Sequence, residues 1–459
     1  MKNSLLWKTL SILGLCVLLL IPLAMIRGLV HERQERAREV ERQMADYAAY
    51  PQTITGPLVV VPFRRTEWTP VERRDGDKTI VEWTSAVTAS TFVVQPQQLG
   101  VSSTLGTETL KRGIYSSELY SADTHIQGHF AIPGRAAMEQ PAPPGKRVEY
   151  DWARPFIVLS VTDPRGIRKL VGNVAGERLS FQPGTGVTWL HQGLHAELGA
   201  PVQATSQIVP FDLRLTLMGT SQLALAPVGK ATNVILSGAW PHPSFVGRFA
   251  PTRREVTDRG FTVEWQTTYW ATGINEESIA RCVVAGSECA LFSGDQLGLR
   301  LIDAVDQYLL TERTVKYAEL FVLLIFASFF MMEVTKQLSI HPVQYALVGL
   351  SSAVFFLLTL SLSEHIAFNV AYWIAASGSI ALLGYYVTHV LGGWRRGVGF
   401  SALLSGLYGL LFGILQSEDS ALLMGSVALF ALLAAVMVIT RNIDWYSVPA
   451  FRRQAQNAS

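Results

Sequence analysis

Two histidines have the spacing of a metal site. His191 and His195 form an H-x-x-x-H pair, which on a helix would place both imidazoles on one face. The surrounding segment, HQGLHAELG, has no Glu beside the first histidine and offers no third ligand. Two histidines in a loop are therefore favoured over a zinc site, and we expect neither a metal nor another cofactor.

A second cluster offers a nucleophile. Ser244 lies two residues after His242 in the stretch WPHPSF at 240–245. No Gly-x-Ser-x-Gly elbow surrounds the serine, and no acid lies beside the histidine. The two prolines fix an extended backbone, which favours a structural corner over a ligand-facing loop. Phosphate-binding glycine patterns are absent as well, so the sequence predicts no catalytic residue and no enzyme.

Two cysteines can form a disulfide. Cys282 and Cys289 lie seven positions apart, and Gly286 between them allows the loop to close. In an oxidising compartment we expect a bridge, and two free thiols are the alternative. Cys16 lies in an apolar run and is expected to remain a thiol.

The charges are distributed unevenly over the chain. Of its 459 residues 49% are hydrophobic and only 16% are charged, against about 25% in ordinary soluble domains. Residues 28–316 hold 29 Lys/Arg and 30 Asp/Glu, and the remainder holds 9 and 6. The sequence therefore predicts one large polar domain and several membrane spans. The net charge of +2 and the lack of a basic stripe predict no nucleic-acid partner.

The first apolar run follows a short cytoplasmic N-terminus at 1–8. The stretch TLSILGLCVLLLIPLAMI forms a helix about 27 Å long and ends without a small-x-small cleavage site. It is expected to be an uncleaved anchor at 9–27. Glu and Arg then recur at spacings of three and four, which favours a solvated, periplasmic stalk helix at 28–50 over a basic membrane-surface helix.

The polar domain at 51–316 has the pattern of strands and turns. Phe211, Leu213, Leu215 and Leu217 alternate with polar residues, which is typical of a strand with one buried and one wet face. The sequence predicts a β-rich, antiparallel, sandwich-like domain.

Five further apolar stretches follow, each bounded by charged residues. The expected spans are 317–335, 343–362, 366–388, 397–416 and 420–440, followed by a tail at 441–459. The fold class is thus a membrane α-helical protein with six transmembrane helices and a β-rich periplasmic domain inserted after the first. Gly409-x-x-x-Gly413 permits close helix packing, within the bundle or in a homo-oligomer.

The short loops indicate the orientation. Loops on one side carry Lys336, Arg395, Arg396 and Arg441, whereas the loops on the other side carry no Lys or Arg. Since cytoplasmic loops hold the excess of positive charge, both termini are expected in the cytoplasm. The large domain would then lie outside a bacterial inner membrane, in the periplasm.

Seven collinear stretches resemble the CreD family, bacterial inner-membrane proteins described as cell-envelope integrity proteins. These stretches are TGPLVVVPF (55–63), RPFIVLSVTDPRGI (154–167), WPHPSF (240–245), DQYLLTERTVKYA (306–318), HPVQYALVGLS (341–351), LSEH (362–365) and TRNIDWY (440–446). They are spaced over almost the whole chain.

The resemblance implies a role rather than a reaction. It implies a contribution to envelope integrity and stress response, including colicin and β-lactam tolerance, and it supplies no catalytic residues. The expected partners are the lipid bilayer, an unknown envelope or periplasmic component and a second copy through the membrane helices. A transporter or channel using the C-terminal helix bundle is one alternative, and an envelope-modifying enzyme with a periplasmic site is the other.

Overall fold

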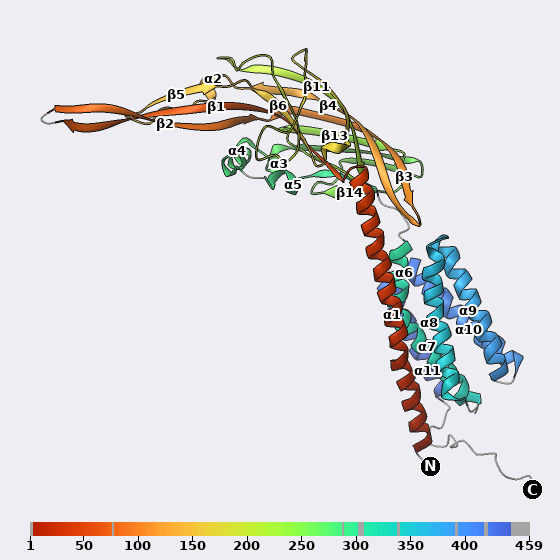
Figure 1. Ribbon diagram of the computed structural model, residues 1–459. Coiled ribbons are helices and arrows are strands. Elements are labelled where there is room, and N and C mark those ends of the chain that lie inside the picture. The colour runs from red at the N-terminus through yellow and green to blue at the C-terminus, as the bar shows by residue number, and fades with distance from the viewer. Residues whose placement is uncertain are drawn as a thin grey trace, which may run out of the picture. The chain divides into compact units, whose positions relative to one another are not determined.

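The chain forms two compact units. The computed structural model describes residues 3–75, 78–286, 289–301, 307–336, 340–390, 393–416 and 421–441. A helical unit comprises Met1–Arg38 and Val305–Ser459, and a β-rich unit comprises Glu39–Ala304. The predicted order of an apolar helix, a large β-rich region and a series of apolar helices is confirmed (Figure 1).

The helical unit contains the N-terminal helix and the C-terminal helices. They are α1 (Asn3–Tyr47), α6 (Gln307–Lys316), α7 (Ala318–Lys336), α8 (Pro342–Ser363), α9 (Phe368–Val390), α10 (Trp394–Gln416) and α11 (Ala421–Thr440). The anchor and the charged stretch after it form one helix, α1, whose last turns belong to the β-rich unit. Helix α6, assigned to the 51–316 domain from the sequence, belongs to the helical unit.

The predicted count of six spans is wrong for the described residues. Four helices there are long and apolar enough to cross a membrane, or five if α6 and α7 form one broken span. Those two helices meet at 45°, and Ala318–Glu333 alone rises about 24 Å, less than a hydrocarbon core of ~30 Å. Helix α11 coincides with the sixth expected span, but many of its side chains lie outside the described residues.

Small residues bring the helices of this unit together. A side chain at Gly349 of α8 would collide with Leu19 of α1 and Phe326 of α7. Gly397 of α10 contacts α9 in the same way. The expected packing position at Gly409 is different, because a Cβ there would meet no described atom within 4 Å. Close approach therefore occurs at glycines that the G-x-x-x-G spacing did not indicate.

The β-rich unit holds two sheets. The nine-stranded sheet contains, in order, β14 (Pro243–Gly247), β17 (Leu297–Leu301), β12 (Gln222–Ala226), β1 (Gln52–Asp75), β6 (Phe156–Val161), β10 (Gly193–Glu197) and β9 (Gln182–Pro183), with β2 (Lys78–Val94) and β5 (Arg147–Trp152) paired to β1. In Figure 1, β1 and β2 extend together as a long two-stranded ribbon.

The second sheet has eight strands. Their order is β15 (Arg253–Thr257), β16 (Gly260–Thr268), β13 (Ala231–Gly238), β3 (Pro96–Arg112), β4 (Tyr115–Ile132), β11 (Gln207–Thr220), β7 (Ile167–Val174) and β8 (Glu177–Arg178). Short helices complete the unit: α2 (Arg135–Met138), a 3₁₀ turn (Pro164–Gly166), α3 (Tyr269–Thr272), α4 (Glu276–Ala285) and α5 (Leu291–Gly294).

One hydrophobic core lies within the β-rich unit, with side chains from both sheets. The expected alternation in β11 is confirmed, since Phe211, Leu213, Leu215 and Leu217 are at most 4% exposed. The expectation of a wholly antiparallel domain is wrong, because β1 pairs with β12 and β3 with β13 in parallel. Those partners are far apart in the chain, so a crossover rather than a hairpin joins them.

Candidate functional site

The two histidines of the H-x-x-x-H pair do not form a metal site with the described residues. His195 lies on strand β10, where its Nδ1 is 2.6 Å from the carbonyl oxygen of Gly184 and its ring contacts Phe156 edge-on. No group of three His, Cys, Asp or Glu that could hold a metal ion occurs in the described part of the chain. The expectation that both histidines lie in a loop is wrong for His195, and His191 precedes β10, so no helix brings the two imidazoles onto one face.

The second half of the WPHPSF stretch, from Pro243, begins β14, an edge strand of the nine-stranded sheet. Ser244 lies opposite Arg300 in the β14–β17 pair. The indole Nε1 of Trp240 donates to the carbonyl of His242 at 3.2 Å, and Phe245 meets Trp265 with ring centroids 6.0 Å apart. These contacts fit the structural corner that the prolines indicate.

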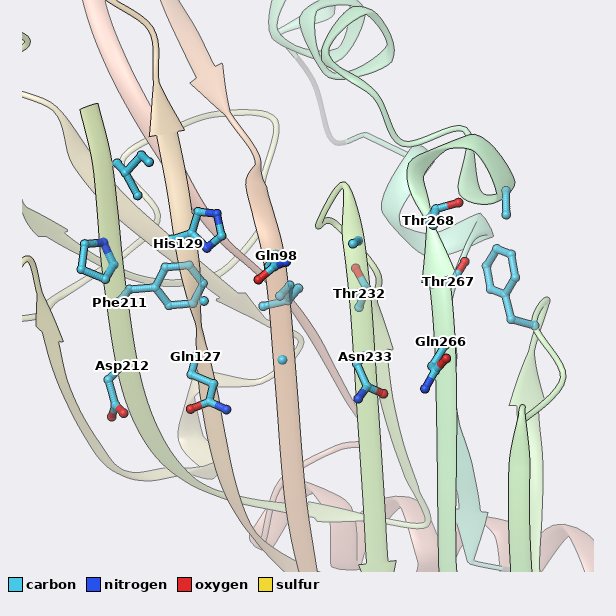
Figure 2. Close-up of a pocket in the computed structure, with 18 of the residues that line it drawn as sticks. Gln98, Gln127, His129, Phe211, Asp212, Thr232, Asn233, Gln266, Thr267 and Thr268 are labelled. Atoms are coloured by element: carbon cyan, nitrogen blue, oxygen red, sulfur yellow. The ribbon is translucent and has the colours of Figure 1, made fainter. Parts of the chain in front are cut away.

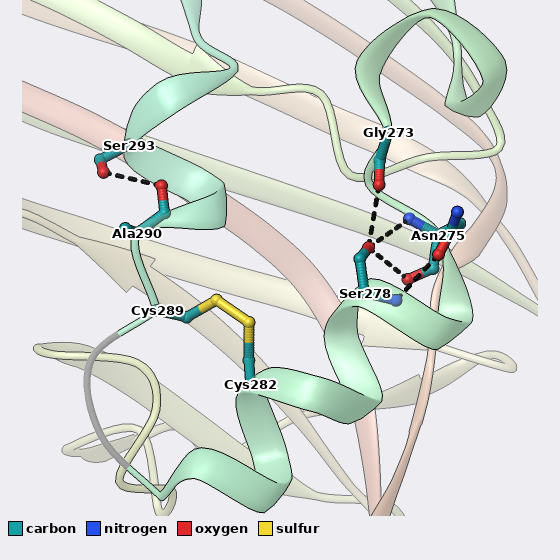
Figure 3. Close-up of a disulfide and its surroundings, with 7 residues drawn as sticks. All are labelled: Gly273, Asn275, Ser278, Cys282, Cys289, Ala290 and Ser293. Atoms are coloured by element: carbon teal, nitrogen blue, oxygen red, sulfur yellow. Dashed lines mark hydrogen bonds between the residues drawn. A yellow bond between two sulfur atoms is a disulfide. The ribbon is translucent and has the colours of Figure 1, made fainter.

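A disulfide joins Cys282 on α4 to Cys289 (Figure 3). The two Cα atoms are 5.5 Å apart, within the usual range for a bridge. Helix α4 is fixed at its start by a capping box between Asn275 and Ser278, and Gly286 ends it in a left-handed conformation (φ 63°). This turn brings the chain back toward Cys282.

Thiol counting tests the bridge. Denatured full-length protein is expected to titrate one thiol, Cys16, without reductant and three with reductant, because an oxidising compartment favours the Cys282–Cys289 pair. By chain entropy, a loop of this length contributes about 2.5 kcal/mol at most. Equal thiol counts with and without reductant would contradict the bridge.

The outer face of the eight-stranded sheet carries a groove of about 1350 Å³. Its floor is formed by β3, β4, β11, β13 and β16, and the segment 248–250 contributes to its lining. Figure 2 shows polar side chains from these neighbouring strands projecting from the same face. The opposite face of the same strands contributes to the hydrophobic core.

One cross-strand row forms the centre of this groove. Gln266, Asn233, Gly100, Gln127 and Asp212 lie directly opposite one another on five successive strands. Neighbouring strands lie about 4.8 Å apart, so the row presents polar groups at regular intervals. We call these five residues the amide row.

The middle of the amide row has unused hydrogen-bonding capacity. At its ends, Asp212 lies 2.8 Å from Nε2 of His125 and Gln266 donates to Glu264 at 2.8 Å. Within the described residues, by contrast, the side chains of Gln127 and Asn233 have no partner in the protein. Both are exposed, so their donors and acceptors face solvent.

Gly100 makes a gap in the amide row. A Cβ at this position would meet Gln127 at ordinary contact distances of 3.5–3.8 Å and nothing closer. The glycine therefore leaves a depression on the sheet without needing an unusual backbone. Elsewhere the lining of the groove is apolar, with Ile208 exposed by 76% and Phe249 half-buried.

A second cluster fixes the end of α1 within the β-rich unit. Asp163 is 6% exposed, forms an ion pair with Arg165 at 2.7 Å and accepts the backbone N–H of Tyr50 at 3.2 Å. Arg165 in turn donates to the carbonyl of Asp46 at 2.7 Å. Gln52 exchanges two hydrogen bonds with the backbone of Asp163. We call these five residues the α1 joint.

Hydrogen bonds and nearby charges shift the pKa values of two groups in the α1 joint, Asp163 and Tyr50. Burial alone would raise the pKa of the Asp163 carboxyl, but hydrogen bonds from Arg165 and from the Tyr50 N–H outweigh it and hold this pKa below its usual value. The hydrogen bond from the Tyr50 hydroxyl to Asp46 raises the pKa of Tyr50. The joint is thus built around an ionised carboxylate.

Comparison with known proteins identifies the family. A family model described as inner membrane protein CreD matches residues 4–446. A curated relative from Escherichia coli (strain K12), also described as inner membrane protein CreD, is 35% identical over 448 residues, which cover 97% of this chain and 95% of the relative. The chain belongs to the CreD family of inner membrane proteins.

Solved structures resemble this CreD-family chain only weakly. An M1 zinc metallopeptidase mutant from Deinococcus radiodurans, bound to a Tyr-Ser-Ala substrate, has a TM-score of 0.18 and 11% identity, covering 38% of this chain and 39% of that one. A two-domain M1 zinc metallopeptidase mutant bound to L-tryptophan has a TM-score of 0.18 and 10% identity over the same shares. Such a likeness carries no argument about fold or function.

One family stretch coincides with part of the α1 joint, and none contains a residue of the amide row. The stretch RPFIVLSVTDPRGI contains Asp163 and Arg165 of the α1 joint. The residues of the amide row were not singled out from this CreD-family sequence, because each is an isolated polar residue in its own strand. Alternation along one strand shows that such a residue faces solvent. Which polar residues of neighbouring strands lie beside it depends on the strand register.

One acidic residue of the helical unit is buried. Glu333, near the end of α7, is 3% exposed in this CreD-family protein. Its carboxylate accepts the backbone N–H of Ile340 at 2.9 Å and the hydroxyl of Tyr345 at 2.7 Å. Glu333 thus connects the end of α7 to the start of α8.

Proposed function

We propose that this inner-membrane protein contributes to cell-envelope integrity and stress response by binding an envelope component, without catalysis, through a periplasmic β-rich unit. The observation that carries the proposal is the groove on the eight-stranded sheet, whose centre offers the unpartnered side chains of Gln127 and Asn233. Amides bind polar ligands but are poor acids, bases and nucleophiles at neutral pH. This chemistry favours recognition over reaction.

Contacts within the helical unit support the proposed orientation. Arg33 of α1 lies 3.5 Å from Glu364, which follows α8, and Gln34 donates to Glu312 of α6 at 2.8 Å. The charged part of α1 and the segment between α8 and α9 therefore lie at the same end of the unit. The cationic positions Arg395 and Arg396 follow α9, one membrane crossing further along the chain. The positive charge of Arg395 and Arg396 favours a cytoplasmic location for their end of the helical unit. The opposite end, with the charged part of α1, would then face the periplasm.

Reporter fusions test the orientation. A phosphatase that is active only in the periplasm, inserted at the exposed Gly176 turn, is expected to be active. The same reporter after Arg396 is expected to be inactive, because the positive loop stays in the cytoplasm. Activity with the reverse pattern would overturn the proposed location of the β-rich unit.

A transporter or channel is the second candidate, because a buried carboxylate such as Glu333 is costly in a membrane and often functional. Its hydrogen bonds from the Ile340 N–H, before α8, and from the Tyr345 hydroxyl, on α8, are equally consistent with a structural contact. Solute flux in proteoliposomes would support transport.

An envelope-modifying enzyme would instead lose its effect on colicin or β-lactam tolerance when His191, His242 and Ser244 are replaced by alanine.

A further inference from the structure

We propose that the groove binds a neutral, hydroxyl-rich oligosaccharide across the amide row. The inference rests on the proposed function, since it specifies the chemical class of the envelope component. It depends on three properties of the groove, which are its free hydrogen-bonding groups, its balance of charge and its apolar flank.

The free groups match the chemistry of sugar hydroxyls. Each side-chain amide offers two donors and one carbonyl acceptor, and each hydroxyl both donates and accepts. Gln127 and Asn233, together with Gln98 on the same face of β3, have no side-chain partner among the described residues. They lie on either side of the Gly100 depression, so a ligand there can bond to amides from three adjacent strands.

The carboxylate and the guanidinium that line the groove already have partners. Asp212 lies beside His125 at 2.8 Å, and Arg248 forms an ion pair with Asp295 at 2.9 Å. A polyanion would need unpaired Lys or Arg to neutralise its charges. The groove therefore favours a neutral ligand.

The apolar flank suits the non-polar faces of sugar rings. Ile208 and Pro210 are exposed on β11, and Phe249 contributes a half-buried ring on the opposite side. The carbonyl of Phe249 accepts the indole N–H of Trp265 at 3.1 Å, which fixes this segment. An aromatic ring held at the margin of a polar site is a common way to orient a ligand.

Geometry disfavours an extended peptide. A peptide gains its affinity by adding a strand to an exposed sheet edge, where backbone groups are free. The amide row lies instead on the face of five strands whose backbones already pair with one another. The volume of about 1350 Å³ also exceeds the roughly 300–1,000 Å³ of sites for small molecules, so several sugar rings fit.

Binding of defined oligosaccharides tests the proposal. Full-length protein in a detergent without sugar headgroups is titrated by calorimetry with chitotetraose, for an N-acetylated glycan strand, and with maltotetraose, for a neutral hexose chain. We expect saturable binding of at least one of the two sugars. The preferred sugar indicates whether the natural ligand is an N-acetylated glycan strand or a neutral hexose chain. Gly100→Leu should weaken binding at least tenfold by filling the depression, and Asn233→Ala should weaken it about threefold.

Gly106→Leu is the matched control. Gly106 lies on the same strand and the same outer face as Gly100 but does not line the groove, and a Cβ there would meet only the Ser121 oxygen at 3.9 Å. This variant should bind like the wild type. No binding of either sugar, equal affinity in Gly100→Leu, or preferential binding of dextran sulfate would overturn the glycan assignment. If the glycan assignment fails while the reporter fusions give the expected pattern and the protein still supports colicin or β-lactam tolerance, the proposed function would stand and the groove would bind another ligand.

Discussion

Replacing Asp163 with alanine is expected to lower the free energy of unfolding of the β-rich unit by about 2 to 3 kcal/mol. The buried carboxylate accepts hydrogen bonds from Arg165 and from the Tyr50 N–H. Its removal deprives both donors of this acceptor. The segment that follows α1 would then lose one of its attachments to the β-rich unit. Urea denaturation of the full-length protein, followed by hydrogen exchange of peptides from 39–56 and 160–170, measures the effect.

Asp258→Ala provides the control for this substitution. Asp258 is an exposed acid in the turn between β15 and β16 of the same unit, and its removal should change stability by less than about 0.5 kcal/mol. A loss of similar size in both variants would show that the α1 joint has no special role.

The pH dependence of the α1 joint follows from the same carboxylate. Because the pKa of Asp163 is lowered by folding, its contribution is present above the unfolded value of about 3.9 and is lost as the pH falls through the lower folded pKa. Asp163→Asn should therefore flatten the acid limb of the stability curve of the β-rich unit. An unchanged acid limb would contradict this assignment.

Replacing Trp265 with alanine is expected to destabilise the β-rich unit by about 4 kcal/mol. Trp265 is 1% exposed on the inner face of β16, contacts Phe245 and donates its indole N–H to the carbonyl of Phe249. The substitution leaves a large cavity and an unpaired backbone carbonyl beside the groove. Chemical denaturation of the full-length protein measures the loss.

Trp270→Ala is the matched control, since Trp270 follows β16 but is 79% exposed. It should change stability by less than about 0.5 kcal/mol. Trp265→Phe should lie between the two, because it retains much of the buried area but loses the hydrogen bond to Phe249 and part of the ring volume. Equal stability of the two alanine variants would contradict the position of Trp265 in the core.

Local sequence patterns were sufficient for the order of the elements. The Glu/Arg spacing after the apolar run correctly predicted that the helix continues beyond this run, since helix pairs depend only on neighbours three and four residues away; α1 ends at Tyr47 rather than at residue 50. Alternation correctly predicted the buried face of β11 for the same local reason. Hydropathy could not show that the expected span at 317–335 is a short helix, α7, which meets α6 at 45°. The sixth expected span falls on α11, many of whose side chains lie outside the described residues.

The sequence by itself determined the class of this protein: an apolar anchor, a charged helix, a strand-rich region and further apolar helices, each specified by short-range periodicity and composition. Tertiary structure alone decided the sites. Asp163 meets Tyr50 across 113 positions of the chain, and Asn233 lies opposite Gly100 only through a parallel pairing of β13 with β3. Periodicity assigns a side chain to a face, but the neighbours of that side chain depend on strand order and register, which are set by packing of the whole unit.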